Sequence, residues 1–251
     1  GISVPGGYEY TSPEAGMADY RLYAGKPVVI KPKSTNFGLG ITILKHNYDE
    51  TDFKAALQIA FEHDNTLLIE KFIPGREFRI FIINDEVVGI LHRVPANVTG
   101  DGVLNIGQLI DMKNEDPLRG KGYRTPLEKI RKGREEEMFL KQQGMDFNTV
   151  PKEREVVYLR ENSNISTGGD SIDFTDDIDD SYKAIAVEAA KALNVKITGL
   201  DMMIQDIHAP ATPDNYAIIE MNFNPAIHIH CYPFKGKNRH LNHKMIKALG
   251  F

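Results

Sequence analysis

Short apolar runs and one amphipathic stretch alternate along the first part of the chain. Residues 28–31 and 41–45 are apolar enough for β-strands, and they flank a segment rich in Gly, Ser and Thr. Residues 49–63 have helical spacing, because their apolar side chains recur on one face: Phe53, Leu57, Ala60 and Phe61. Residues 67–73 form a further apolar run, which Pro74-Gly75 stops. This order predicts strands that enclose one helix.

A β-hairpin follows this unit. Residues 78–83 and 87–94 are apolar segments joined by the turn residues 84–86. Together with the preceding strands and helix, the hairpin predicts one compact α/β unit over about residues 26–95.

The pattern changes in the second half. Residues 111–155 are polar and charged, and they predict an irregular loop followed by a helix from about Pro126 to Gln143. Residues 170–180 are acidic and lead into a helix, whose dipole favours negative charge at that end. We interpret the acidic run as helix entry and solvated surface. The apolar stripe of this helix comprises Ile178, Tyr182, Ile185, Ala189 and Leu193. Residues 197–206 and 216–223 predict two antiparallel strands.

Composition excludes some classes of function. The 251 residues carry a net charge of -5, which argues against broad nucleic-acid binding. No apolar run approaches the roughly 20 residues that span a bilayer, and residues 1–5 do not read as a signal peptide. Cys231 is the single cysteine, so no internal disulfide forms, and we expect a reducing cytoplasm. The first residue is not Met, which favours a processed chain or a fragment.

Lys31 ends an apolar strand and enters a loop that contains Ser34, Thr35, Gly38 and Gly40. A lysine there can reach phosphate oxygens as a point charge. Hydroxyl groups and backbone N–H groups near glycines can surround anionic oxygens. The loop matches neither a Walker A loop nor the dinucleotide Gly-x-Gly-x-x-Gly pattern. An ordinary glycine turn in a hairpin is the alternative interpretation.

Residues 70–77 are a second candidate for nucleotide contacts. Glu70 ends a strand and Glu77 follows a tight turn. Such a turn can present backbone groups to an adenine edge, and the second carboxylate can bind ribose hydroxyls. Strand–turn–strand units with flanking charges are also common without a ligand, so both interpretations stay open.

A carboxylate on one strand and a carboxylate with an amide on the next predict a magnesium site. Glu220 and Asn222 are two residues apart, so their side chains point to one face of a strand, and Asp201 lies on the neighbouring strand. Magnesium takes carboxylate oxygens together with substrate phosphates and water. Carboxylates among apolar neighbours are costly without a counter-charge, which a metal supplies. Phosphate binding and magnesium binding together predict nucleoside triphosphate chemistry.

The segment His228-Ile229-His230-Cys231 would be a poor zinc site, because no fourth ligand is evident nearby. Packing or pocket lining is the better interpretation. No Ser/His/Asp or Cys/His arrangement predicts a protein nucleophile.

With these residues assembled, the chain resembles the ATP-grasp superfamily of carboxylate–amine ligases over nearly its whole length. Two subgroups are most similar: the glutathione synthetase module of bacterial bifunctional glutamate–cysteine ligase/glutathione synthetase, and cyanophycin synthetase. The segments that carry the resemblance are residues 31–40, 93–102, 114–122, 166–169 and 230–239. Within them, Lys33, Asn36-Phe37 and residues 231–237 resemble the glutathione module.

The resemblance implies roles for the matching positions. Lys31 would contact the phosphates of ATP, with Arg79 and Arg93 stabilising charge near the γ-phosphate. The closing loop would comprise Lys33, Ser34, Thr35, Gly38 and Gly40, and the adenine hinge Glu70, Lys71, Phe72 and Ile73, with Glu77 on the ribose. Two magnesium ions, or manganese ions, would be held by Asp201, Glu220 and Asn222. The peptide substrate would lie near Arg160, Asn162, Asn164, Ser166, Thr167, Gly168, Gly169, Asn224, Lys235, Lys237 and Arg239.

The implied reaction joins γ-glutamylcysteine to glycine through an acyl phosphate, giving glutathione, ADP and phosphate. The implied fold is α/β, with two subdomains that grip ATP between them: a lid over residues 26–95 and a core over residues 96–251 that carries the polar insertion 111–155. Residues 1–25 would be the remnant of a preceding subdomain, and we expect weak or no activity without that subdomain. The implied partner is an N-terminal glutamate–cysteine ligase domain, and a homodimer is compatible with the family. A cyanophycin synthetase-like ligase and an inactive ATP-binding fragment are the alternatives.

Overall fold

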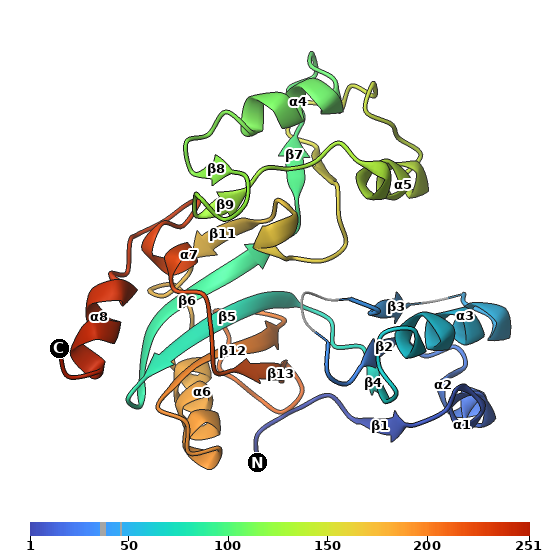
Figure 1. Cartoon of the computed structure of the whole chain (residues 1–251), viewed down its shortest axis with the longest axis horizontal. Coiled ribbons are helices and arrows are strands. Elements are labelled where there is room, and N and C mark those ends of the chain that lie inside the picture. The colour runs from blue at the N-terminus through green and yellow to red at the C-terminus, as the bar shows by residue number, and fades with distance from the viewer. Residues whose placement is uncertain (36–38, 46) are drawn as a thin grey trace.

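The computed structural model describes residues 1–35, 39–45 and 47–251. Within them the chain forms a four-stranded sheet, a five-stranded sheet and two pairs of short strands. Figure 1 shows three lobes: one built around the four-stranded sheet, one around the five-stranded sheet, and a third above them. No helix in the described ranges is long and apolar enough to cross a membrane.

The first lobe, which we call the lid, contains an antiparallel sheet in the order β1-β4-β2-β3. Its strands are β1 (Gly7–Tyr10), β2 (Val28–Pro32), β3 (Thr42–Leu44) and β4 (Leu67–Lys71). Its helices are α1 (Pro13–Ala18), α2 (Tyr20–Tyr23) and α3 (Glu50–Phe61). A capping box between Asp49 and Asp52 begins α3, and Phe53 and Leu57 bury its apolar face against Ile30 and Ile69. The alternation of apolar residues along β2 therefore fixes which face of the sheet α3 covers.

The second lobe contains an antiparallel sheet in the order β11-β6-β5-β12-β13. Its strands are β5 (Arg76–Ile83), β6 (Glu86–Val94), β11 (Asp170–Asp173), β12 (Ile197–Ile204) and β13 (Tyr216–Asn222). Helix α6 (Asp180–Ala192) packs on one face, where Phe78, Ile80 and Ile82 are buried. Phe81 and Ile83 point to the other face, towards α7 (His228–Cys231) and α8 (Leu241–Ala248). Arg79 shares that second face by the same period-two alternation.

The third lobe has a hydrophobic core of its own. Its elements are β7 (Asn97–Thr99), α4 (Ile106–Lys113), β8 (Arg119–Gly120), β9 (Leu127–Glu128), α5 (Arg134–Gln142) and β10 (Val156–Tyr158). Strands β7 and β10 pair antiparallel, and Val98, Ile106, Ile110, Leu140 and Val157 are buried between the strands and helices. The chain then returns to the five-stranded sheet through the 3-10 turn η1 (Ile165–Thr167).

Three sequence expectations differ from these pairings. The hairpin β5–β6 pairs with β12 and β11, so it belongs to the five-stranded sheet and not to the unit 26–95. Residues 1–25 are part of the lid, because β1 pairs with β4 and α1 packs on α3. The helix expected from Pro126 to Gln143 is shorter, because residues 127–128 form β9 and α5 begins at Arg134. Period and turn residues predict strands, but they do not say which sheet a strand joins.

The N-terminal segment also connects the lid to the second lobe. The backbone carbonyl of Ser3 accepts a hydrogen bond from the N–H of Ile218 (2.9 Å), and the N–H of Ser3 donates to the hydroxyl of Tyr216 (3.1 Å). Gly6, three residues later, accepts a bond from the N–H of Lys71 in the lid (2.8 Å). Residues 3–6 therefore connect both sheets beside the direct link through Pro74-Gly75.

Candidate active site

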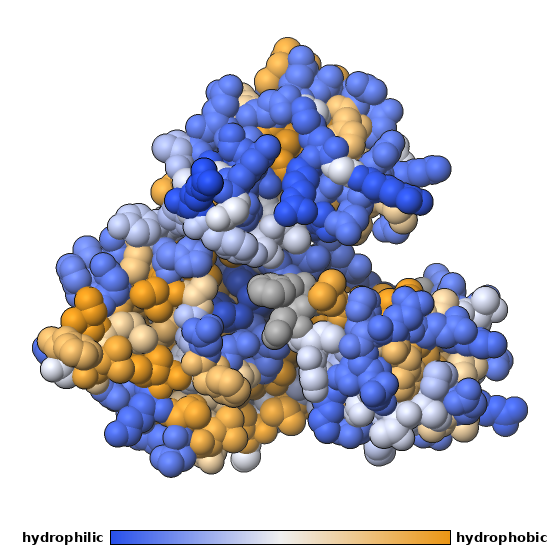
Figure 2. Space-filling view, in the orientation of Figure 1, coloured by the Kyte–Doolittle hydropathy of each residue, from blue (hydrophilic) through white to orange (hydrophobic). Residues whose placement is uncertain are grey.

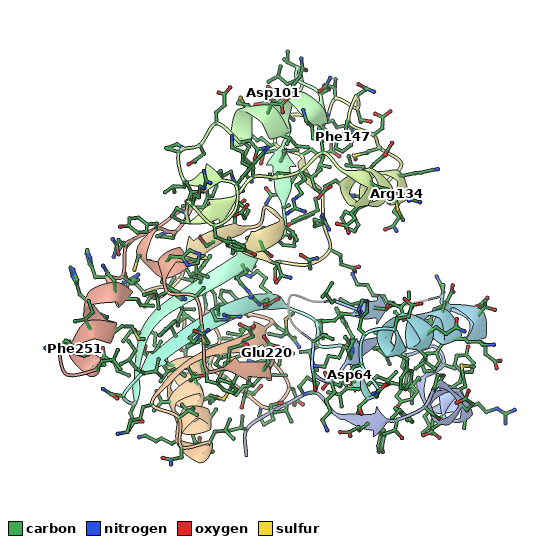
Figure 3. The ribbon with its side chains drawn as sticks, viewed as in Figure 1. Asp64, Asp101, Arg134, Phe147, Glu220 and Phe251 are labelled. Carbon is green, nitrogen blue, oxygen red and sulfur yellow. The ribbon has the colours of Figure 1, made fainter. Side chains whose placement is uncertain are left out.

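A row of charged residues crosses three strands of the five-stranded sheet. Arg79 on β5 lies opposite Asp201 on β12, and Asp201 lies opposite Glu220 on β13. Directly opposed residues share one face of a sheet, so the three side chains converge. Figure 3 labels Glu220 near the centre of the molecule. The row therefore lies near where the lobes meet.

Asp201 is buried at 2% exposure and held by two guanidinium groups. Arg79 donates through Nη2 to Oδ2 (2.8 Å) and also through Nε to Oδ1, and Arg93 donates through Nη2 to Oδ2 (3.0 Å). Burial acts to raise the pKa of Asp201, but the charge of Arg93 and the hydrogen bond from Arg79 outweigh it and hold the pKa below its ordinary value. Asp201 is therefore a carboxylate that orients two cations towards one place.

Glu220 and Asn222 supply the remaining oxygen groups of the expected metal site. Glu220 is exposed, and the amide of Asn222 donates to its Oε1 (2.8 Å). Among the described residues no three His, Cys, Asp or Glu side chains form a metal site, so any ligand set here consists of two acids and an amide. Such a set fits a hard cation that completes its shell with phosphate and water, as magnesium does.

Asp201 has a counter-charge in the protein itself, beside the metal expected from the sequence. Its charge is balanced by Arg79 and Arg93, which lie 122 and 108 residues away in the chain. A metal cation at this site is therefore indicated mainly by Glu220, whose exposed carboxylate lies opposite Asp201.

Lys31 in the lid forms an ion pair with Glu70 across the neighbouring strands (2.6 Å). Lys31 lies opposite Leu68, so Glu70 is its diagonal neighbour on the same face. Both side chains are mostly buried, at 16% and 17% exposure. A phosphate that reached Lys31 would compete with the carboxylate of Glu70 for its ammonium group.

The loop after β2 is only partly in the described ranges, since Gly38, Asn36 and Phe37 lie outside them. Lys33 points to β1, where it pairs with Glu9 (2.7 Å). The backbone N–H of Ser34 donates to Asp64 (2.7 Å), and the hydroxyl of Thr35 donates to the carbonyl of Leu39 (3.0 Å). Figure 3 labels Asp64 in the lid. In this conformation Lys33, Ser34 and Thr35 therefore contact other groups of the lid.

Gly40 needs to be glycine for two reasons. Its φ is 76°, in the left-handed region, and a Cβ there would lie 2.7 Å from side-chain atoms of Pro32 and His63. The loop can therefore return to β3 only through a residue without a side chain.

The expected adenine hinge, residues 70–73, has two backbone donors already engaged. The N–H of Lys71 donates to Gly6 (2.8 Å) and that of Phe72 donates to Pro27 (3.1 Å). Other backbone groups of the segment, such as that of Ile73, would have to read an adenine edge.

Glu77 is held from two sides. Arg93 forms an ion pair with it, and the hydroxyl of Ser163 donates to its Oε2 (2.7 Å). Sequence reasoning missed Ser163, although it lies between the two candidates Asn162 and Asn164. Arg93 thus links the expected ribose carboxylate Glu77 to Asp201.

The expected peptide residues form two groups in the structure. Arg160 is bound to Glu135 and Glu136 at the start of α5, with 2.6 Å between Nη2 and Glu136 Oε1. Residues 162–169 form a compact turn, in which the hydroxyl of Thr167 donates to Oδ1 of Asn162 (2.9 Å). Ser166 and Gly168 belong to this turn, and Gly168 has a φ of 94°.

The C-terminal candidates lie elsewhere. Asn224 and Lys235 are exposed, and the backbone carbonyl of Lys235 accepts from the N–H of Asp173 (2.9 Å). Lys237 pairs with Asp176 (2.6 Å), and Arg239 binds both Asp173 and Asp176. Lys237 and Arg239 therefore fasten the C-terminal segment to the end of β11.

A buried ionic cluster that sequence reasoning missed joins the third lobe to β11. The carboxylate of Asp170 binds Lys113 (2.6 Å) and Arg119, and it accepts a hydrogen bond from Asn97 (3.0 Å). Arg119 also donates to the carbonyl of Gly168 (3.0 Å). In the sequence, Lys113 and Arg119 are simply two cations in a polar stretch, and nothing local indicates that they pair with Asp170. The cluster fixes the turn of residues 162–169 to the third lobe.

His230 is fully buried against Phe81, with ring centroids 5.4 Å apart. Neither ring nitrogen has a hydrogen-bond partner among the described residues. Burial lowers the pKa of His230 to about 3, so the ring is neutral. The residue packs in the core beside Cys231, as the sequence interpretation had it.

Comparisons with known proteins agree with the resemblance seen in the sequence. A family model described as the D-ala D-ala ligase C-terminus matches residues 11–108. The glutathione biosynthesis bifunctional protein GshAB of Desulfotalea psychrophila is 61% identical over 251 residues, which is 100% of this chain and 32% of that protein. The Clostridium perfringens protein of the same name is 55% identical over 248 residues, 99% of this chain and 32% of that protein. The chain spans about a third of the length of these curated relatives.

Solved structures give the same picture. A bifunctional glutathione synthetase from Pasteurella multocida superposes with a TM-score of 0.73 and 47% identity, over 99% of this chain and 34% of that one. A D-alanine–D-alanine ligase from Bacillus anthracis, at 18% identity and a TM-score of 0.51 over 90% of this chain and 53% of that one, shares the fold alone. The fold is therefore that of the ATP-grasp ligases, as the sequence predicted.

Proposed function

We propose that this chain is a glutathione synthetase module, which joins γ-glutamylcysteine to glycine at the expense of ATP. The observation that carries the reaction class is the row Arg79–Asp201–Glu220, with Arg93 bound to Asp201. Lys31 in the lid is the further cation assigned to phosphate. The substrates are inferred from the name of the relatives that match the chain along its whole length. The relatives are bifunctional and about three times as long as this chain. We assign only the glutathione synthetase step to this chain.

The first step transfers a phosphoryl group. The cysteine carboxylate of the dipeptide attacks the γ-phosphorus of ATP, the bond to the ADP oxygen breaks, and an acyl phosphate forms. Charge grows on the transferred oxygens, and Arg79 and Arg93 are oriented by Asp201 to meet it. Lys31 exchanges Glu70 for phosphate oxygens when the lid closes.

The second step forms the peptide bond. The amine of glycine attacks the acyl carbon and loses a proton, and phosphate leaves with its bond to that carbon broken. No protein nucleophile takes part, in agreement with the sequence. The lid excludes water, because water would hydrolyse the acyl phosphate.

Asp201, Glu220 and Asn222 would hold magnesium at this site. The bound metal would supply positive charge that neutralises the phosphates of ATP. We infer two ions, and manganese is an acceptable substitute because it takes the same oxygen ligands. We also propose that the residues matched to the family, from Lys33 to Lys235, contact ATP and the peptide.

The partner of the module is the remaining part of the bifunctional protein, which in the relatives makes up about two thirds of the length. That part would supply γ-glutamylcysteine. A cytoplasmic location and a homodimer are further parts of the proposal.

Product analysis tests the proposed function. The natural polypeptide that carries this chain is incubated with Mg-ATP, γ-glutamylcysteine and glycine, and glutathione and ADP are measured by mass spectrometry and a coupled assay. Equal amounts of both products, each requiring all substrates, are expected. Product from aspartate or arginine in place of glycine would favour the cyanophycin-like alternative. ATP binding without product would favour a binding fragment.

A further inference from the structure

One stretch of the third lobe departs from the acidic character of the chain. Residues 119–134 contain seven Lys or Arg and one acidic residue, Glu128, whereas the whole chain has a net charge of -5. Nothing in the proposed chemistry uses most of these cations. Figure 2 shows that the side of this lobe that faces the other two is strongly hydrophilic.

Four of these cations, Lys121, Lys129, Arg131 and Lys132, line a groove of about 660 Å³ on the third lobe. One wall is the C-terminal end of α4 and the residues after it, with Asp111, Asn114 and Glu115, and the other is the segment from Lys121 to Lys132. A volume of several hundred Å³ suits a small-molecule ligand. The groove therefore combines a concave shape with local positive charge.

Some of the charges in the groove are already paired. Lys132 binds Asp111 (2.7 Å), and Glu128 accepts hydrogen bonds from the backbone N–H groups of Gly122 and Tyr123. These contacts hold the two walls and the turn between β8 and β9. They leave a smaller set of side chains for a ligand.

The remaining charged side chains are three cations and one carboxylate. Lys121, Lys129, Arg131 and Glu115 form no ion pair or side-chain hydrogen bond with any part of the chain that the structure describes. A phosphate would meet the three cations but would leave Glu115 without a partner. A ligand that carries one carboxylate and one ammonium group would satisfy both kinds of charge.

The groove adjoins the turn expected to contact the peptide substrate. A Cβ at Gly168 would lie 2.8 Å from Cα of Ile130, which lies between Lys129 and Arg131. A Cβ at Gly169 would lie 2.8 Å from the carbonyl oxygen of Val94, the neighbour of Arg93. Ile130 and the turn at Gly168 and Gly169 therefore form one closely packed wall between the groove and Val94, the neighbour of Arg93.

We propose that this groove binds the α-amino-acid head of a γ-glutamyl dipeptide. Lys129 and Arg131 bind its α-carboxylate, with Lys121 adding charge, and Glu115 binds its α-ammonium group. The cysteine carboxylate then extends past Gly168 towards Arg93. The assignment rests on the proposed function for the identity of the dipeptide. A site of this kind would select a γ-linked glutamate. The γ-linkage uses the side-chain carboxyl group and leaves the α-carboxylate and the α-ammonium group free to bind.

Charge-removing variants with matched analogues test the site. Arg131→Gln, Lys129→Gln and Glu115→Gln are assayed in the natural polypeptide with γ-glutamylcysteine, glutaryl-cysteine (no ammonium) and γ-aminobutyryl-cysteine (no α-carboxylate). With γ-glutamylcysteine we expect the KM for the dipeptide to rise at least about tenfold for each variant, the loss of one charge-assisted contact. The KM for ATP should stay within about twofold.

The analogues identify which group meets which side chain. The effect of Glu115→Gln should vanish with glutaryl-cysteine, and the effects of Lys129→Gln and Arg131→Gln should vanish with γ-aminobutyryl-cysteine. Lys141→Gln and Glu137→Gln, exposed charges on α5 outside the groove, are the matched controls and should change no KM. A wild-type KM for the dipeptide in all three groove variants would overturn the inference while leaving the proposed function intact.

A binding measurement separates the two proposals. If the wild-type protein makes no glutathione, the proposed function fails, and calorimetry with γ-glutamylcysteine decides the groove alone. If Arg131→Gln weakens the binding of γ-glutamylcysteine and Lys141→Gln does not, the result would support the groove as its binding site. Absent binding, or equal binding by both variants, would overturn it.

Discussion

Arg79 and Asp201 face each other in register on β5 and β12, and the guanidinium group binds the carboxylate through two donors. Asp201 also holds Arg93, so a single buried acid sets the direction of two cations. Burial of the carboxylate strengthens these bonds and makes each partner dependent on the others. In the proposed mechanism, charge stabilisation by oriented arginines depends on this arrangement.

Asp201→Asn should lower stability as well as activity. The amide leaves two guanidinium groups without their counter-charge, and we expect the free energy of unfolding at pH 7 to fall by about 3 kcal/mol. Urea unfolding measures it. The exposed Asp214→Asn is the control and should change stability by less than about 0.5 kcal/mol. Equal stability of both variants would show that Asp201 is not a buried counter-ion.

The pH dependence of stability should change in the same variant. Because the folded-state pKa of Asp201 is below its ordinary value of 3.8, its contribution is full above that value and is lost as the pH falls through the folded-state pKa. Asp201→Asn should therefore lose less stability than the wild type when the pH falls below about 4. Parallel acid-unfolding curves for the two proteins would contradict the depressed pKa.

Glu220→Gln should separate magnesium binding from folding. Glu220 is exposed and its bond to Asn222 survives in an amide, so stability should change little. Affinity for ATP in the presence of magnesium should fall at least about tenfold, because one anionic ligand is lost. Calorimetry with and without magnesium measures this. The exposed Glu188→Gln on α6 should bind as the wild type does; a similar loss there would remove Glu220 from the metal site.

Lys31→Met should weaken ATP binding about tenfold or more, because a phosphate would lose its point charge. Glu70→Gln should leave ATP binding within about twofold, since it only releases Lys31 from a competing carboxylate. Nucleotide titration by fluorescence or calorimetry measures both. A stronger defect in Glu70→Gln than in Lys31→Met would mean that the carboxylate, not the lysine, contacts the nucleotide.

His230→Leu should make the fold less sensitive to mild acid. The folded-state pKa of His230, about 3, lies below the ordinary 6.5, so its contribution is full above pH 6.5 and is lost progressively as the pH falls towards 3. Between pH 7 and pH 5 the wild type should therefore lose about 2 kcal/mol more stability than His230→Leu. Denaturant unfolding at the two pH values measures the difference, with the exposed His208→Leu as the control. An equal loss in wild type and His230→Leu would contradict a neutral buried ring.

Local pattern predicted the strands that build the site, because period-two alternation and turn residues are local properties. The same pattern predicted that Glu220 and Asn222 share one face of a strand and that Asp201 lies beside them. The observed register of β12 and β13 agrees with this. The local pattern did not predict that β5 pairs with β12, because strand pairing depends on contacts more than a hundred residues apart. For the same reason the two arginine partners of Asp201 were assigned from family resemblance and not from spacing.

The third lobe was the least predictable part. Its strands contain two or three residues, which is too short for a period to show, and its core forms only when β7, α4 and β10 come together. Arg160 and Arg119 illustrate the limit. The resemblance places Arg160 near the substrate, which stays a prediction, and no local pattern indicated its ion pair with Glu136. Arg119 had no expected role, and the structure buries it against Asp170. Long-range ion pairs between charged residues leave no local signal.

The central claim is that the ligation proceeds through an acyl phosphate, and transfer of an oxygen isotope tests it most directly. γ-Glutamylcysteine with oxygen-18 in its cysteine carboxylate is given to the natural polypeptide with Mg-ATP and glycine, and the phosphate and glutathione are analysed by mass spectrometry. An acyl phosphate predicts that each glutathione formed is matched by one phosphate that carries one labelled oxygen. Unlabelled phosphate released with ADP would mean that ATP is hydrolysed by water, and it would contradict the proposed ligase mechanism.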